Sequence, residues 1–86
     1  MLKILVSVKD NVADMFNDPR AEINAGSAIR SFCLTVKESP HKDDFALYQI
    51  GTFDTDNGTV KFNEPIRIYS GHDVQVDNVS EIKQEA

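Results

Sequence analysis

The chain has 86 residues, of which 41 % are hydrophobic and 27 % charged, and its formal net charge is −5. A chain of this length forms one small domain, and its composition lies far from the low hydrophobicity of disordered chains. Its apolar runs are much shorter than the roughly 18 residues that a membrane-spanning helix requires. We therefore expect a single domain over residues 1–79, a polar tail over residues 80–86 and no association with a membrane.

The charge is divided unevenly along the chain. Residues 1–42 carry six basic and five acidic side chains, whereas residues 43–86 carry three basic and nine acidic ones. An acidic surface repels phosphate, so the overall balance argues against DNA binding. Any contact with nucleic acid would need a local basic patch, built mainly from the first half of the chain, or a partner protein.

The cysteine content and the N-terminal residues indicate where the protein acts. Cys33 is the single cysteine, so an internal disulfide and a cysteine zinc site are ruled out and a reducing cytoplasm is expected. Met1 leads directly into a strand-like pattern, without the basic and apolar segments of a secretory signal.

Alternating hydrophobic residues predict a first strand over residues 2–9. One face carries Leu2, Ile4, Val6 and Val8, and the other carries Lys3, Leu5, Ser7 and Lys9. Residues 10–23 are rich in Asp and Asn and predict a long loop. In so small a domain such a loop is either disordered or functional.

A helix is predicted from Ala25 to Lys37. Asn24 is a suitable N-cap residue, and Pro40 disfavours helical backbone just before it. The apolar residues that fall on one side of this helix are Ala25, Ala28, Ile29, Phe32, Cys33 and Val36, while Leu34 lies on the other side. Gly26 in the first turn indicates either that the helix begins one or two residues later or that another backbone, or a phosphate, approaches closely.

The second half of the chain predicts strands. Residues 45–53 are apolar on both faces, as in a central strand, and residues 54–58 form a turn with Asn57-Gly58. Residues 59–62 and 66–69 form two further strands, separated by Pro65 at an edge or bend. Residues 74–76 would add a weak pairing. The predicted fold is α+β, a small antiparallel sheet in the order β-α-β-β-β with one amphipathic helix packed on one face.

The sequence contains no recognisable catalytic or metal-binding pattern. The turn at Asp54 lacks the calcium ligands of an EF-hand, because Gly58 and Pro65 occupy two of the ligand positions. His41 and His72 have no third nitrogen or sulfur ligand, and Cys33 lies on the apolar side of the helix, where core packing is expected. We expect no catalytic residue, no metal, no cofactor and no enzymatic activity.

The sheet face away from the helix is the candidate contact surface. Lys3 and Lys9 point outward in the predicted first strand, and Lys61, Arg67 and Tyr69 could join them. Basic side chains beside tyrosines can hold the phosphates and stack the bases of a single strand. The alternative is an ordinary solvated face, on which lysines prevent edge-to-edge pairing.

Three short motifs in order resemble the small non-structural protein of gokushovirus-type microviruses, tailless phages with circular single-stranded DNA genomes. The resemblance covers residues 1–70. Ala28, Ile29, Arg30 and Phe32 match the helix motif, His41, Asp44 and Phe45 match the loop motif, and Leu47, Tyr48, Ile50, Gly51, Phe53 and Asp54 match the strand motif. The loop has Asp43 in place of the family's glutamate. It departs further at Lys42, where the family usually has proline, so this loop is expected to be less rigid than in the family.

The resemblance implies a non-capsid protein of the host cytoplasm that takes part in single-stranded DNA synthesis, and it transfers no catalytic residue. Arg30, flanked by Lys37, is the first choice for a contact, followed by Lys3, Lys9, Lys61 and Arg67. The leading hypothesis is an accessory factor that binds single-stranded DNA or engages phage replication or packaging proteins. The alternative is a protein-interaction module that acts on the phage initiator, the procapsid or a host factor without contacting DNA. Exposed sheet edges and Leu34 further predict a homodimer.

Overall fold

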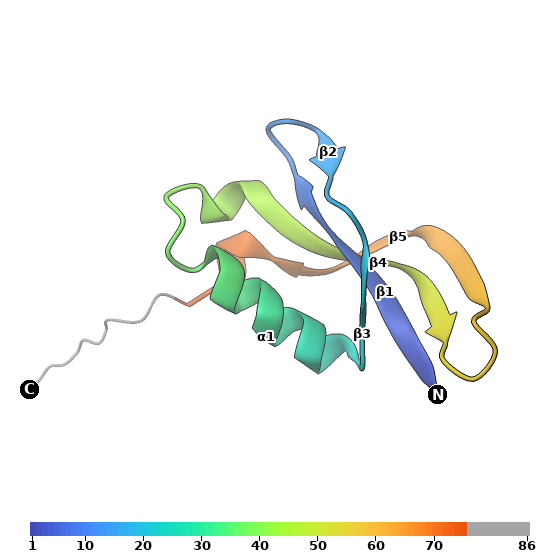
Figure 1. The fold of residues 1–86 in the computed structure, drawn as a ribbon. Helices are drawn as coiled ribbons and strands as arrows, with labels where there is room; N and C mark the ends of the chain where they lie inside the picture. Colours follow the sequence, from blue (N-terminus) through green and yellow to red (C-terminus); the bar gives the residue numbers. More distant parts are fainter. Residues whose placement is uncertain (76–86) are drawn as a thin grey trace, which may run out of the picture.

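The computed structural model describes residues 1–75, and it places one helix against a curled antiparallel sheet of five strands (Figure 1). The elements are β1 (Leu2–Asp10), β2 (Met15–Phe16), β3 (Arg20–Glu22), α1 (Ala25–Val36), β4 (Phe45–Asp54) and β5 (Val60–Ser70), with short 3-10 turns η1 (Lys42–Asp44) and η2 (Gly71–Asp73). The predicted α+β fold is therefore confirmed. The domain boundary at residue 79, the predicted tail and Val76 lie outside the described residues. In residues 1–75 no helix has the length and hydrophobicity needed to span a membrane.

The sequence predicted a long loop over residues 10–23, but this segment contains the two short strands β2 and β3. The sheet runs in the order β2-β1-β4-β5, and β3 also pairs with β1, so β2 and β3 both come from this segment. Asp10 begins the reversal, because its Oδ1 accepts hydrogen bonds from the backbone N–H of Val12 at 2.9 Å and of Ala13 at 3.2 Å. Pairing with β2 and β3 satisfies the backbone groups of β1 that would otherwise form an open edge.

The two short strands predicted around Pro65 form one long edge strand, β5. Its pairing with β4 shifts register twice, between Leu47 and Tyr48 and again between Gln49 and Gly51. The second irregularity spans Pro65 on the β5 side, and proline is tolerated in an edge strand because its missing N–H need not break a ladder bond. The preceding turn has Gly58 at a φ of 75°, the left-handed conformation that glycine favours. Val74 and Gln75 form no strand, which corrects the predicted weak pairing, because Val74 instead packs in the core with 4 % exposure.

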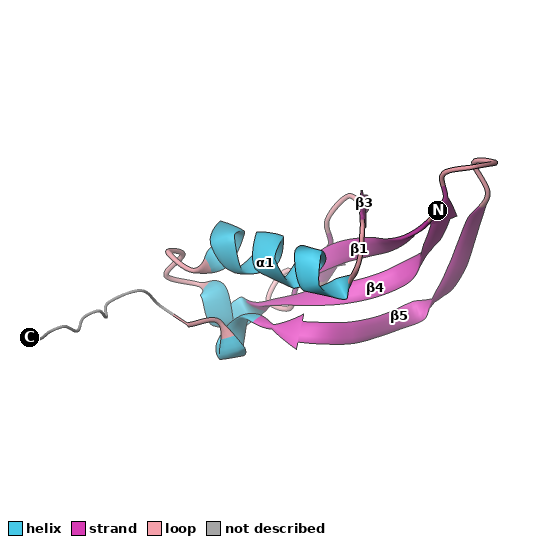
Figure 2. Cartoon of the chain, turned by 90° about the horizontal axis from the view of Figure 1, so that it is seen from below, coloured by secondary structure: helices cyan, strands magenta, loops and turns pink. Residues whose placement is uncertain are grey.

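The helix forms where the sequence predicted it and covers one face of the sheet (Figure 2). Asn24 caps its first turn, since its side-chain oxygen accepts a hydrogen bond from the Ser27 N–H at 2.8 Å. The core lies between α1 and the sheet and comprises Val6, Ala28, Phe32, Val36, Leu47 and Val74. Cys33 is half-buried and packs against this core. Leu34, on the opposite side of the helix, is 63 % exposed.

Gly26 lies inside the helix, so the predicted later start is wrong. Within the described chain, the nearest atom to a Cβ at this position would be the capping Oδ1 of Asn24, at 3.5 Å, which is an ordinary contact. The helix does not extend over the whole sheet, and Figure 2 shows that the β4–β5 hairpin continues beyond it. Leu2, predicted to face the helix, is consequently 64 % exposed.

Candidate nucleic-acid interface

The face of the sheet turned away from α1, called the outer face below, is defined by the strand register. Directly opposite residues of paired antiparallel strands project on the same face. Across β1, β4 and β5 the rows on this face are Lys3–Phe53–Val60, Leu5–Gly51–Phe62, Ser7–Tyr48–Arg67 and Lys9–Ala46–Ser70. At the margin of the sheet, Phe16 of β2 lies opposite Lys9 and Ala21 of β3 lies opposite Leu5.

Within the described residues, the paired positions of the outer face carry basic side chains and no acidic ones, and the carboxylate of Asp14 forms an ion pair with one of them, Lys9. Three of the predicted contact residues, Lys3, Lys9 and Arg67, lie on this face, and none of its paired positions in residues 1–75 is Asp or Glu. The carboxylates of the paired positions lie on the other face, at Asp10, Glu22 and Asp54. The sheet thus separates the two signs of charge, and a local basic surface exists on a chain whose net charge is −5.

The three cations differ in how accessible their side chains are to a ligand. Arg67 is exposed and Lys3 is half-buried. Lys9 is 25 % exposed, because its Nζ lies 3.2 Å from Oδ1 of Asp14 and 5.5 Å from the ring centroid of Phe16. A ligand can therefore reach Arg67 directly, whereas contact with Lys9 requires that its exposed ion pair with Asp14 be broken.

The sequence predicted that Tyr69 shares the face of Arg67, but the two side chains lie on opposite faces of the sheet. Arg67 lies opposite Tyr48, but Tyr69 lies opposite Leu47, so Ile68 forms a bulge that interrupts the alternation of β5. The Tyr69 ring lies on the helix side, with its centroid 6.3 Å from that of Phe32 and the two rings inclined by 77°. Tyr69 is therefore a partner of the core.

Lys61 also lies on the opposite face from the one predicted. It pairs with Thr52, which in turn pairs with Ile4, and Ile4 packs against the core on the helix side. Lys61 itself is exposed, since it belongs to the part of the hairpin beyond the helix. It borders a second, shallow hollow with Leu2 and Asp54.

The two predicted contacts on the helix lie apart from the outer face. Arg30 is exposed on α1. Lys37 is half-buried at the C-cap, where its backbone N–H donates to the carbonyl of Cys33 at 3.0 Å. The structure thus places Lys3, Lys9 and Arg67 on one face of the sheet, in separate rows, and leaves Arg30, Lys37 and Lys61 elsewhere.

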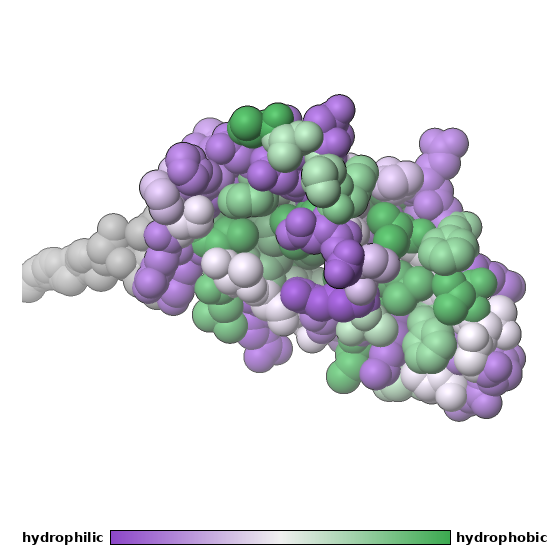
Figure 3. All heavy atoms as spheres, turned by 45° about the horizontal axis from the view of Figure 1, so that its top comes forward, coloured by the Kyte–Doolittle hydropathy of each residue, from purple (hydrophilic) through white to green (hydrophobic). Residues whose placement is uncertain are grey.

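Aromatic side chains complete the outer face, and the sequence analysis did not identify them as functional. They are Phe16, Tyr48, Phe53 and Phe62. Phe16 and Tyr48 meet edge to face with centroids 5.2 Å apart, and Phe62 is 76 % exposed. Figure 3 shows hydrophobic side chains gathered at the end of the molecule that carries the β4–β5 hairpin. The signal that could have revealed them is the alternation of aromatic with basic residues, but the face of each depends on the register.

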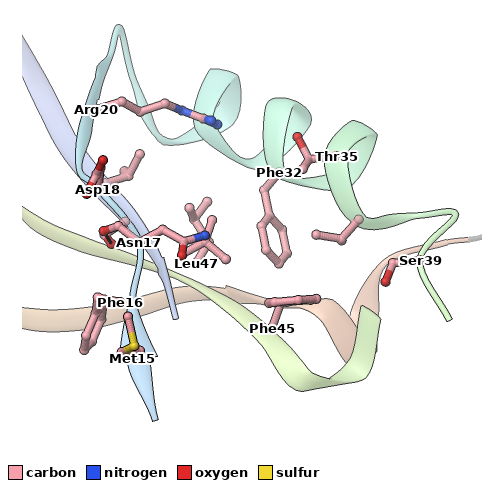
Figure 4. Close-up of a pocket in the computed structure, with 14 residues that line it drawn as sticks. Met15, Phe16, Asn17, Asp18, Arg20, Phe32, Thr35, Ser39, Phe45 and Leu47 are labelled. Atoms are coloured by element: carbon pink, nitrogen blue, oxygen red, sulfur yellow. Dashed lines mark hydrogen bonds between the residues drawn. The ribbon is translucent and has the colours of Figure 1, made fainter. Parts of the chain in front are cut away.

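A pocket of about 670 Å³ lies between α1 and the strands β1 and β2 (Figure 4), and Ser7 and Phe16 of the outer face are among the residues that line it. The ring of Phe32 points from the helix toward Phe45, Leu47 lies beside them, and Arg20 reaches from β3 toward the helix. The guanidinium of Arg20 bonds to Glu22, with Nε 2.9 Å from Oε2. No His or Cys lines the pocket, and the described residues contain no group of three His, Cys, Asp or Glu that could hold a metal ion.

A polar cluster joins η1 to η2 at the end of the sheet. Lys42 Nζ lies 3.0 Å from Oδ1 of Asp43 and donates to the carbonyl of Gly71 at 3.3 Å. The hydrogen bond from Lys42 lowers the pKa of the Asp43 carboxyl, with a smaller contribution from His72, whose Nδ1 lies 3.6 Å away. Because Lys42 and Asp43 hold the two turns together, this cluster has a structural role.

The fold and this surface describe a small α+β domain with a one-sided core and a basic, aromatic outer sheet face. A family model described as Phage ORF5 protein matches residues 3–74, and the chain therefore belongs to the Phage ORF5 protein family. The phage origin implied by the three motifs is thus confirmed. Neither the curated proteins nor the solved structures contain a significant match to this chain.

Proposed function

We propose that this phage protein is the small non-structural protein of a gokushovirus-type microvirus and serves as a non-enzymatic accessory factor in viral single-stranded DNA synthesis. It acts in the host cytoplasm by binding single-stranded DNA on the outer face of its sheet. The observation that supports this function is the position of Lys3, Lys9 and Arg67 on one face of the sheet, whose paired positions in the described residues carry no carboxylate. The match of residues 3–74 to the Phage ORF5 protein family supports the phage part of this assignment.

The number of cations sets the strength expected of the interaction. Each phosphate contact with a single strand contributes about −0.7 to the slope of log K against log salt concentration. Three contacts therefore predict a slope of about −2 and binding that is weak at physiological salt. The ion pair between Lys9 and Asp14 reduces this further, because the pair must open before Lys9 contacts a phosphate.

Titration of a fluorescent oligonucleotide at several salt concentrations tests the function. We expect Lys3→Ala and Arg67→Ala each to weaken binding and to reduce the salt slope by about 0.7, since each removes one phosphate contact. Arg30→Ala is the matched control, because Arg30 is exposed but lies on the helix. Loss of binding only in Arg30→Ala would move the interface to α1. Absence of binding even at low salt would refute DNA contact.

The second candidate is an interaction module for the phage initiator, the procapsid or a host factor. Leu34 favours it, because this large hydrophobic side chain is 63 % exposed on the solvent side of α1, opposite the side that packs on the core. Crosslinking in infected cells that contain either the parent chain or Leu34→Glu would test it. A partner that binds this side of the helix should be crosslinked to the parent chain and lost in the variant. Sedimentation over a range of concentrations tests the expected homodimer in the same preparations.

A further inference from the structure

We infer that the outer face contacts bases as well as phosphates, and that Phe62, Phe53 and Tyr48 stack unpaired bases. This inference rests on the proposed function and names its ligand as single-stranded nucleic acid rather than duplex. Unpaired bases expose their faces to aromatic side chains, whereas the bases of a duplex are stacked on one another.

The aromatic rings are flanked by cations on both margins of the sheet. Phe53 and Tyr48 belong to the central strand β4; Lys3 on β1 lies opposite Phe53, and Arg67 on β5 lies opposite Tyr48. A strand of nucleic acid laid over β4 would therefore have bases on the rings and cations on either side for its phosphates. Cations beside stacking side chains are the usual combination for binding a single strand without sequence preference.

Phe62 is the most accessible of the rings. It lies opposite Gly51, which has no side chain to cover it, and it is 76 % exposed. Phe53 is its diagonal neighbour on β4, and such pairs lie about 7–8 Å apart, within reach of aromatic side chains. Two successive bases could thus occupy neighbouring rings.

The charge of the face favours nucleic acid over a second copy of this chain. If two outer faces packed together, Lys3 and Arg67 of each copy would be buried with no carboxylate at a described paired position to neutralise them, whereas Lys9 has Asp14 as its partner. Juxtaposition of like charges disfavours such an interface. Phosphate, by contrast, supplies the missing negative charge.

Tyrosine fluorescence gives a direct test, because the chain has two tyrosines and no tryptophan. Tyr48 lies on the outer face, and Tyr69 packs against Phe32. In a Tyr69→Phe variant the remaining emission comes from Tyr48, and we expect single-stranded DNA and single-stranded RNA to quench it at the concentrations at which they bind. A duplex of the same length should bind at least several-fold more weakly and leave the emission unquenched. The reciprocal Tyr48→Phe variant should bind single strands without quenching.

Substitution of the exposed ring tests stacking separately from phosphate contact. Loss of one stacked base weakens binding about 5- to 150-fold, so we expect that loss in Phe62→Ala with an unchanged salt slope. Phe62→Tyr, which keeps a ring, should retain the affinity, and circular dichroism should show both variants folded. An oligomer of abasic sites should bind the parent chain and Phe62→Ala equally.

The outcomes separate this inference from the function on which it rests. If Phe62→Ala binds single strands as tightly as the parent chain, stacking is refuted while salt-dependent binding still supports the proposed function. If duplex is preferred, or if Phe62→Ala instead dissociates a dimer without changing DNA affinity, the stacking assignment is overturned. If no oligonucleotide binds at low salt, both the function and the inference fail.

Discussion

Gly71→Ala should destabilise the domain by an amount that follows from the contacts of the missing Cβ. Gly71 is buried at the start of η2, and a Cβ there would overlap the backbone carbonyl oxygen of Lys42. It would also lie 2.8 Å from the carbonyl oxygen of Phe45 and 2.9 Å from the carbonyl carbon of Lys42. These are backbone atoms of η1 and of the first residue of β4, so neither can rotate away as a side chain would. Overpacking of this kind costs about 1–3 kcal/mol.

The same change at Gly26 is the matched control. A Cβ at Gly26 would have its nearest neighbour at 3.5 Å, the Oδ1 of Asn24, so alanine fits without displacement. Alanine in a helix is favoured over glycine by up to about 1 kcal/mol, partly because an unfolded chain with alanine has less conformational entropy to lose on folding than one with glycine. Gly26→Ala should therefore stabilise the domain while Gly71→Ala destabilises it.

Thermal and urea denaturation of the two variants, followed by circular dichroism, measure the difference. For a domain of this size, each kcal/mol corresponds to a shift of about 4–8 °C in Tm. We expect Gly71→Ala to melt below the parent chain and Gly26→Ala at or above it. Equal or higher stability of Gly71→Ala would show that η1 and η2 are not packed against each other as described.

Further predictions concern the cap, the core and the polar cluster. Asn24→Ala should cost about 1 kcal/mol of unfolding free energy in urea, because the first turn loses its capping oxygen; an unchanged midpoint would contradict the cap. Phe32→Ala should cost about 3–5 kcal/mol, since this fully buried ring joins α1 to the sheet; a smaller loss than that of Asn24→Ala would argue against this core. Because the pKa of Asp43 is lowered in the folded chain, its ionised carboxylate stabilises the fold at pH values above the ordinary pKa of 3.8. That contribution disappears as the pH falls through the folded pKa. The stability difference between the parent chain and Asp43→Asn should therefore shrink between neutral and strongly acidic pH, and a constant difference would refute the pairing with Lys42.

The helix could be predicted from the sequence because its determinants are local. Asn24 caps the helix by accepting a hydrogen bond from the backbone N–H of Ser27, only three residues further along the chain. The spacing of Ala28, Phe32 and Val36 follows the helical period. The turn before β5 was predictable for the same reason, because Gly58 adopts the left-handed conformation that its position requires.

The edge strands and their faces could not be predicted, because they depend on pairing between distant residues. The short strands β2 and β3 carry little periodicity, and they form because β1 offers them an unpaired edge. A single bulge at Ile68 places Tyr69 on the helix side, and the irregular stretch around Pro65 likewise separates Lys61 from Arg67. Since alternation has a period of two, each such shift moves every following side chain to the other face.

The net charge of the chain is a poor guide to its candidate interface for the same geometric reason. Several carboxylates on the helix side of the sheet have local partners: Glu22 Oε2 lies 2.9 Å from Nε of Arg20, and Asp54 Oδ1 lies 3.8 Å from the N-terminal amine. At physiological salt the field of an exposed charge is largely screened beyond about 8 Å, so distant carboxylates do little to oppose a phosphate on the outer face. What matters there is the local set of Lys3, Lys9 and Arg67. The salt slope of the outer-face variants, rather than the isoelectric point, therefore decides whether this acidic protein binds DNA.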